Sequence, residues 1–168
     1  TISMDITQAR PTDLIEVLYL LKVCIADMRS RGLTHWNSAY PDPQQIEKDL
    51  LEGSIYLLKD KGVTKGMVTL TPDAPSEYRQ VAFASTEKPL YVKRLAVHPA
   101  VKDDSGERML FDFAMQFGRD HGFGSIRTDI WQTTTGSAKT CEALQFETPG
   151  TAGPESPRFP MTCFEKRL

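Results

Sequence analysis

Apolar residues recur along this chain with two different periods, one typical of strands and the other typical of helices. Residues 2–7 alternate apolar and polar positions, which predicts an edge strand. Apolar residues then recur at helical spacing over residues 14–28 and stop at Gly32, so a long amphipathic helix is expected. Asp13 and Glu16 resemble a capping box at its start.

The next segment continues the pattern with a second helix and two strands. Asp42 and Pro43 mark a helix start, since aspartate is favoured as N-cap and proline in the first turn, and Gly53 marks its end. Apolar runs at residues 54–59 and 65–71 predict strands joined by a turn. A largely polar, irregular insertion over residues 72–89 follows.

The rest of the chain is organised around a strand–loop–helix unit at residues 91–122. Its strand is a short apolar run that ends at His98-Pro99, because proline has no N–H for a strand ladder. After a polar loop, apolar residues recur at helical spacing from Met109 to Phe117, and Gly122 supplies a stop. The helix N-terminus offers unpaired N–H groups, which suit an anion such as phosphate.

The C-terminal third adds two strands and a short helix. The pattern predicts strands at residues 125–131 and 161–167, a helix at 138–144, and a proline-rich surface loop at 149–160. Helices and strands mixed in this way indicate an α/β (α+β) fold with helices on both faces of a mixed sheet. The length of 168 residues, without internal repeats, predicts one domain over residues 1–168.

Several short motifs of this chain resemble motifs of the GNAT family of acyl-CoA N-acyltransferases. They lie at residues 94–99 (RLAVHP), 112–114 (DFA) and 121–129 (HGFGSIRTD), and the tail 159–168 resembles the closing strand of one bacterial branch. The resemblance covers nearly the whole chain and implies a mixed, mostly antiparallel GNAT-like central sheet. It also implies transfer of acetyl from acetyl-CoA to a primary amine of a small molecule or peptide, by direct attack in a ternary complex.

The resemblance places the cofactor-binding positions at the end of the central strand and the start of the next helix. The family's strand pairs with the pantetheine arm, and its phosphate loop usually reads Gln/Arg-x-x-Gly-x-Gly/Ala. By the resemblance, Thr134 stands at a position where the family has an asparagine. The candidate cofactor-binding residues of this chain are therefore Leu95, Ala96, Val97, Lys102, Ser105, Gly106, Glu107, Arg108 and Thr134.

Acidic residues in this loop oppose a bound diphosphate. Asp103, Asp104 and Glu107 stand around the first turn, where each complements the helix dipole by ~0.3–1 kcal/mol. Two like-charge contacts at ~1 kcal/mol each weaken diphosphate binding by roughly 10–30-fold. Two functions therefore stay open: an N-acetyltransferase, or a non-catalytic GNAT-fold protein with a degraded CoA site that serves as a binding module.

Three side chains are candidates for proton transfer. Asp129 and His98 can accept the amine proton, and an imidazole has an ordinary pKa of about 6.5. Their alternative roles are a hydrogen bond at a strand end and a structural His-Pro turn. By the resemblance, Cys141 stands at the family's donor tyrosine, and a thiol of pKa about 8.5 can protonate a leaving thiolate. Its alternative role is that of a small buried hydrophobic residue.

Two apolar features invite a functional interpretation. Trp36 and Tyr40 lie in the loop at residues 33–42 and form either a lid on the core or, as the resemblance implies, a wall of the acceptor site. Phe111 and Met115 stand apart from the main apolar stripe of their helix. Either a neighbouring element such as residues 138–144 covers them, or they form the contact of an isologous homodimer.

Composition narrows the remaining classes. A net charge of −2 gives no sign of nucleic-acid or anionic-membrane binding, and no apolar run approaches the ~18–20 residues of a membrane span. Three cysteines without a CxxC motif predict reduced thiols rather than a disulfide or zinc framework. Scattered histidines predict no metal site. With no secretory signal at residues 1–5, a cytoplasmic location is expected.

Overall fold

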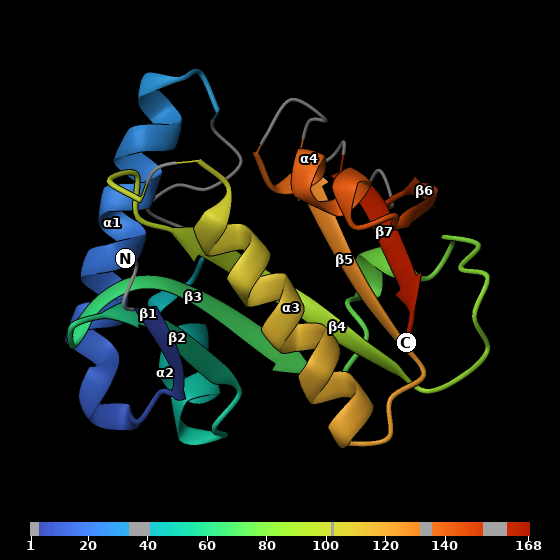
Figure 1. Cartoon of the computed structure of the whole chain (residues 1–168), viewed down its shortest axis with the longest axis horizontal. Coiled ribbons are helices and arrows are strands. Elements are labelled where there is room, and N and C mark those ends of the chain that lie inside the picture. Colours follow the sequence, from blue (N-terminus) through green and yellow to red (C-terminus); the bar gives the residue numbers. More distant parts are fainter. Residues whose placement is uncertain (1–3, 34–40, 102, 132–135, 153–160) are drawn as a thin grey trace. The chain divides into compact units, whose positions relative to one another are not determined.

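The computed structural model describes residues 4–33, 41–101, 103–131, 136–152 and 161–168 (Figure 1). The described elements are β1 (Met4–Gln8), η1 (Pro11–Asp13), α1 (Leu14–Ser30), α2 (Pro43–Leu51), β2 (Ile55–Asp60), β3 (Val63–Thr71), η2 (Ser76–Tyr78), β4 (Pro89–Val97), α3 (Ser105–Asp120), β5 (Ser125–Trp131), α4 (Gly136–Ala143), β6 (Glu147–Thr151) and β7 (Met161–Arg167). The strands hydrogen bond in the order β1-β2-β3-β4-β5-β7-β6.

The sheet is mixed and mostly antiparallel, as the sequence predicts. β1 with β2, β2 with β3, β5 with β7 and β6 with β7 are antiparallel pairs. β4 and β5 are parallel, and their register joins Pro89, Leu90 and Tyr91 to Ser125, Ile126 and Arg127.

The contacts of the chain divide it into two compact units. One contains residues 1–69 and 94–110, and the other contains residues 70–93 and 111–168. The divisions fall inside β3, β4 and α3, so each of these elements contributes to both units. That the whole chain is one domain stays a prediction from its length.

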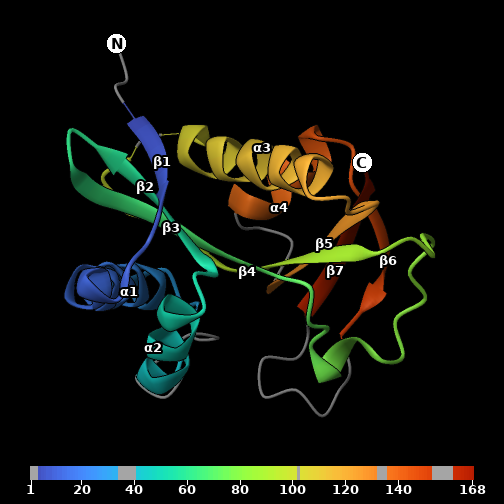
Figure 2. The same ribbon diagram turned by 90° about the horizontal axis from the view of Figure 1, so that it is seen from below.

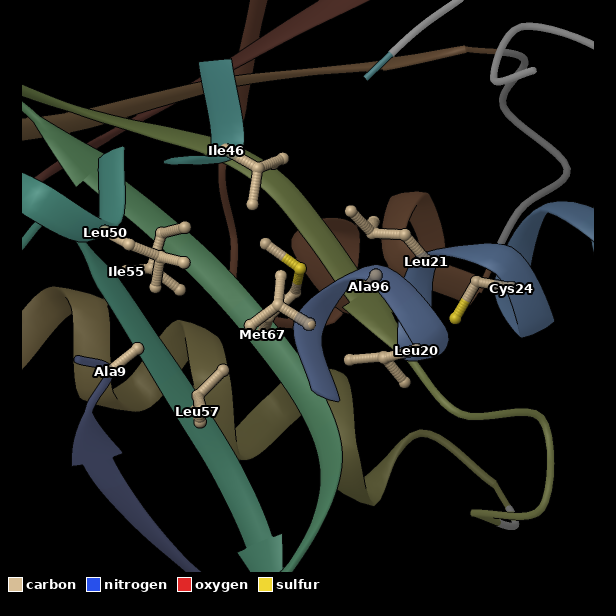
Figure 3. Packing of buried hydrophobic residues seen from close by; sticks show 11 residues of the cluster. Ala9, Leu20, Leu21, Cys24, Ile46, Leu50, Ile55, Leu57, Met67 and Ala96 are labelled. Carbon is tan, nitrogen blue, oxygen red and sulfur yellow. The ribbon is translucent and has the colours of Figure 1, made fainter. Parts of the chain in front are cut away.

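In the first unit, α1 and α2 lie on one face of β2 and β3, and the first turns of α3 lie on the other face (Figure 2). The apolar stripes of α1 and α2 meet the strands in one cluster, drawn in Figure 3. Its buried residues are Ala9, Val17, Leu20, Leu21, Cys24, Ile46, Leu50, Ile55, Leu57, Met67 and Ala96. The helical period of the sequence thus becomes the packing face of α1, and the alternation in the strands supplies the opposite wall.

The two predicted helix caps differ in outcome. The Asp42 carboxylate accepts a hydrogen bond from the Gln44 N–H at 2.9 Å, which confirms it as the N-cap of α2. The capping box of α1 is wrong, because Asp13 makes no side-chain cap there. Its carboxylate instead accepts the Arg10 N–H at 2.8 Å and closes the short η1 turn that precedes α1.

A buried ion pair joins α2 to β4 in the first unit. The Arg94 guanidinium donates to the Asp49 carboxylate, and the two side chains are only 7% and 6% exposed. Gln45 donates a further hydrogen bond to Asp49 at 2.8 Å. Arg94 also has a φ of 50°, a left-handed conformation that costs an ordinary residue ~1–3 kcal/mol. The residue of β4 that forms the ion pair with α2 therefore has a strained backbone.

In the second unit, the insertion at residues 72–89 is tied to the sheet through one carboxylate. Glu165 on β7 accepts the N–H groups of Ala84 and Ser85 at 2.8 and 3.3 Å, and it also accepts Nε of Arg127 at 2.9 Å. The Arg127 guanidinium lies 4.2 Å from the centre of the Phe83 ring. The sequence pattern predicts that this insertion is irregular and polar. In the structure, buried polar contacts hold its second half in place.

Phe111 and Met115 are covered from inside the second unit. Their exposed fractions are 1% and 6%, and the Phe111 ring meets the Phe146 ring edge-on at 5.7 Å. A neighbouring element therefore covers them, and the interpretation of these two residues as a homodimer contact is wrong. The residue that packs on Phe111 follows α4 rather than lying within it.

One strand was missed by the sequence pattern. β6 spans Glu147–Thr151 and pairs with β7, whereas a surface loop was expected from residue 149. Pro149 has no N–H to donate, and the pairing shifts register between Glu147 and Gly150, which suits an edge strand.

Among the described residues, no helix combines the length and apolar character that a membrane crossing requires.

The buried pair gives a direct test of the packing between α2 and β4. We expect Asp49→Ala to lower the free energy of unfolding by ~3–5 kcal/mol, because it leaves the Arg94 charge buried without a partner. Denaturant titration measures the loss.

The matched control is Asp27→Ala, in a pair with Arg31 at 3.0 Å whose side chains are 35% and 54% exposed. An exposed pair of this kind contributes ~0–1 kcal/mol. Equal losses in the two variants would contradict a special role for the buried pair.

Candidate functional site

The first turn of α3 is held by groups of the chain itself. The Ser105 N–H donates to the Asp103 carboxylate at 2.8 Å, and Asp103 has a φ of 56°. Gly106 is buried against the end of β4, where a Cβ would lie 2.7 Å from Cγ1 of Val97. The glycine predicted for close approach of a ligand thus allows close approach of helix and strand.

Glu107 turns one carboxylate oxygen into the protein. Its Oε2 is buried and has no hydrogen-bond partner among the described residues. Burial raises the pKa of Glu107 above its usual value; a hydrogen bond from its own backbone N–H opposes the shift, and Asp104 and Asp103 add to it. Glu107 in turn contributes to the raised pKa of Cys24, which burial dominates.

A diphosphate fits this helix end poorly with the side chains as they lie. One N–H of the turn is bonded to Asp103, and Glu107 engages its own N–H. Arg108, the basic residue at the turn, pairs with Asp104 at 3.5 Å. Carboxylates of the chain therefore already fill the role that an anion would have at a helix N-terminus.

The strand residues expected to meet pantetheine, Leu95, Ala96 and Val97, lie at the end of β4 in the first unit. Ala96 is buried in the core cluster, and Leu95 and Val97 are partly buried. The Cys24 thiol donates to the Val97 carbonyl at 3.4 Å, and burial raises the pKa of this thiol to about 12. That this strand end binds a co-substrate stays a prediction.

His98 follows β4 and is oriented by the backbone. Its own N–H donates to the Lys65 carbonyl at 2.7 Å, and its Nδ1 accepts the Ala100 N–H at 3.0 Å. The neutral ring therefore carries its proton on Nε2. Burial lowers the pKa of His98, Lys65 lowers it further and Asp27 opposes the shift. The ring is thus mostly neutral near pH 7, which is the form that a base requires.

Asp129 and Cys141 belong to the second unit. Asp129 lies in β5 opposite Cys163 of β7, and it contributes to the rise of the Cys163 pKa to about 12, which burial dominates. Cys141 is 0% exposed on α4, and burial raises its pKa to about 12 as well. A thiol this weakly acidic is a poor proton donor, which favours the interpretation of Cys141 as a small buried hydrophobic residue.

Four predicted site residues lie outside the described part of the chain: Trp36, Tyr40, Lys102 and Thr134. Within the first unit, the fold brings Val97, Gly106 and Glu107 together with Cys24. Sequence reasoning missed Cys24 and the Asp49–Arg94 pair. Cys24 is indistinguishable in sequence from the other apolar positions of its helix, and a contact across 45 residues leaves no local signal.

Side chains that bind metals do not gather in the described residues. No group of three or more histidine, cysteine, aspartate or glutamate side chains there could hold an ion. Cys24, Cys141 and Cys163 are all buried free cysteines.

Comparison with solved structures gives the class of the fold. A GNAT-family acetyltransferase from Listeria monocytogenes matches with a TM-score of 0.78 at 19% identity, over 98% of this chain and 95% of that one. One from Streptococcus agalactiae matches with a TM-score of 0.81 at 16% identity and the same coverage. PaiA N-acetyltransferase from Thermoplasma acidophilum, in complex with coenzyme A, matches with a TM-score of 0.74 at 12% identity, over 99% of both chains.

The chain therefore has the GNAT fold, as its short sequence motifs predict. No protein-family model matches the sequence, and no curated protein sequence matches it. Identities this low establish the fold alone, so the activity has to be argued from the residues.

The buried carboxyl of Glu107 predicts a dependence of stability on pH. Its pKa is higher in the folded chain than in the unfolded chain, so the folded state binds the proton more tightly. Stability therefore falls as the pH rises from the ordinary glutamate value of 4.5 through the raised folded value. Glu107→Gln removes this titration.

We expect the difference in unfolding free energy, Glu107→Gln minus wild type, to be larger at pH 7 than at pH 4. Denaturant titrations of both proteins across this range measure it. A difference that stays constant with pH would show that the Glu107 carboxyl is not perturbed.

Proposed function

We propose that this protein is an N-acetyltransferase that moves acetyl from acetyl-CoA to a primary amine of a small molecule or peptide. The observation that carries the proposal is the likeness of nearly the whole chain to acetyltransferases, one of them in complex with coenzyme A. In this reaction the amine attacks the thioester directly in a ternary complex, without a covalent acyl-enzyme. Three free thiols suit a reducing compartment such as the cytoplasm.

The acceptor class is proposed from proteins of the same fold. They include an agmatine N-acetyltransferase and an N-acetylglutamate synthase from Neisseria gonorrhoeae in complex with coenzyme A and N-acetyl-glutamate. Agmatine and glutamate both present a primary amine, which must lose a proton before or during attack. In our proposal Asp129 or His98 accepts that proton.

A second candidate is a non-catalytic protein that keeps the fold as a binding module. It is favoured by the carboxylates at the start of α3: Asp103 caps Ser105, and Glu107 turns inward. Asp103 stabilises the helix end, and both carboxylates oppose the negative charge of a diphosphate. The two candidates differ in whether acetyl-CoA binds to the natural sequence.

Titration calorimetry with acetyl-CoA separates the candidates. An N-acetyltransferase should release or absorb heat in a saturable manner and gain thermal stability with the ligand, because a ligand that binds only the folded state stabilises it. No heat and no thermal shift at millimolar acetyl-CoA would reject the enzyme and leave the binding module.

A charge-removing variant tests the explanation for weak binding. We expect Asp103→Asn with Glu107→Gln to tighten acetyl-CoA binding by roughly 10–30-fold, since two like-charge contacts disappear. Asparagine tolerates the positive φ at residue 103 and can still accept the Ser105 N–H, so the turn is preserved.

The matched control is Glu142→Gln on α4, which removes a carboxylate outside this turn. It should leave the affinity for acetyl-CoA unchanged. An equal gain in both proteins would point to overall charge rather than to the start of α3. No gain in either protein would reject the proposed repulsion.

A further inference from the structure

The second unit contains a cavity of about 330 Å³, lined by the segment at residues 74–83 and by the first residues of β4 and β5. A cavity of this size accepts a small organic ligand, since ligand pockets span ~300–1,000 Å³. The described candidates for co-substrate binding, at residues 95–97 and 105–108, belong to the first unit instead. The proposed acetyl transfer therefore assigns no role to this cavity.

Aromatic rings form much of the cavity wall. Tyr78, Phe83 and Tyr91 line it, and the centre of the Tyr78 ring lies 5.6 Å from that of Phe83 and 5.8 Å from that of Tyr91. Tyr78 and Tyr91 are each only 5% exposed, and they belong to a buried cluster with Met161 and Cys163. The packing of the second unit therefore fixes these two rings, and their flat apolar faces favour a planar ligand.

A fixed guanidinium lines the same cavity. The Arg127 side chain is only 12% exposed, and its Nε donates to the Glu165 carboxylate at 2.9 Å. One terminal nitrogen donates to the Tyr91 hydroxyl at 3.3 Å, and the other donates to the Ser85 carbonyl at 2.7 Å. Because a guanidinium has five N–H donors, each terminal nitrogen keeps one N–H without a partner among the described residues. Arg127 thus offers donors that are oriented before a ligand binds.

The charges at the cavity favour an anion. The described lining residues include two arginines, Arg79 and Arg127, and no aspartate or glutamate. Glu165 offsets the charge of Arg127 but does not line the cavity, so the guanidinium atoms there are donors. A carboxylate accepts hydrogen bonds from a guanidinium, and such charge-assisted bonds are stronger than neutral ones.

The aromatic wall does not invite a cation, although aromatic rings often bind one. The Arg127 guanidinium lies 4.2 Å from the centre of the Phe83 ring and 6.0 Å from that of the Tyr91 ring. These rings therefore already hold a cation of the chain itself. A cationic ligand would meet like charge at this place, whereas an anionic ligand would not.

We propose that this cavity binds a small aromatic carboxylate. The ring of the ligand packs against the aromatic wall, and its carboxylate accepts N–H groups from Arg127 and Arg79. Both parts of the ligand are needed, because the wall is apolar and the charged groups are donors. This site is additional to the proposed site for acetyl-CoA, and its occupation does not depend on acetyl transfer.

Titration calorimetry with phenylacetate, on the full chain without acetyl-CoA, tests the proposal. Three analogues separate the parts of the ligand: phenylacetamide keeps the ring without the charge, acetate keeps the charge without the ring, and 2-phenylethylamine reverses the charge. We expect phenylacetate to bind at least roughly tenfold more tightly than each analogue, because each lacks the charge-assisted hydrogen bonds or the ring contacts. A smaller preference over any analogue, or no saturable heat with millimolar phenylacetate, overturns the proposal.

A pair of variants tests the place of binding. Arg127 is unsuitable for substitution, because its loss would leave Glu165 buried without its partner. Arg79 is exposed, so Arg79→Gln should fold normally and weaken phenylacetate binding by roughly tenfold. The matched control is Arg119→Gln, an exposed position on α3 in the same unit, which should bind like wild type. Thermal unfolding shows that both variants are folded.

An Arg79→Gln protein that binds like wild type overturns the proposed site, and so do equal losses in the two variants, which would point to overall charge. Nuclear Overhauser contacts locate the ligand without any substitution. The ring protons of bound phenylacetate should show contacts with the rings of Tyr78, Phe83 and Tyr91. Contacts with side chains of the first unit instead would contradict the proposal.

Discussion

The buried contact between Arg94 and Asp49 sets how helix α2 meets strand β4, and the core of the first unit depends on that meeting. Both charges are withdrawn from water, so each is stable only while the other stays in place. With α2 held there, Ile46 and Leu50 close the cluster formed by α1 and the strands. Arg94 also keeps a left-handed backbone and a buried Nε that has no hydrogen-bond partner among the described residues. The strain is retained because the surrounding packing determines it.

A related constraint acts at the start of α3. Gly106 brings the helix against Val97, and the Val97 carbonyl accepts the Cys24 thiol, so the strand end and the helix start are packed from two sides. The Asp103 carboxylate then accepts the Ser105 N–H and supplies the negative charge that suits a helix N-terminus, whereas burial disfavours the charge of Glu107. The same features that stabilise this end of the helix reduce what it can offer to an external phosphate.

The two candidate bases differ in their surroundings. His98 follows β4 and lines a hollow of the first unit, and its lowered pKa leaves the imidazole mostly neutral near pH 7. Asp129 lies in β5 of the second unit, opposite Cys163 of β7. In our proposal the side chain that lies within hydrogen-bond reach of the bound amine accepts its proton.

The sequence alone determined most elements, because helices and strands bury apolar residues with different periods; α1, α2 and the central strand–helix unit are visible in that way. Its short motifs also predicted the GNAT fold. Tertiary structure decided what no local pattern encodes: the pairing of β6, the capture of Asp13 by the preceding turn, the burial of Phe111 under Phe146 and the inward turn of Glu107. Each of these features depends on residues distant in sequence or on competition between neighbouring turns. Its contribution to the free energy of folding therefore exists only in the folded chain.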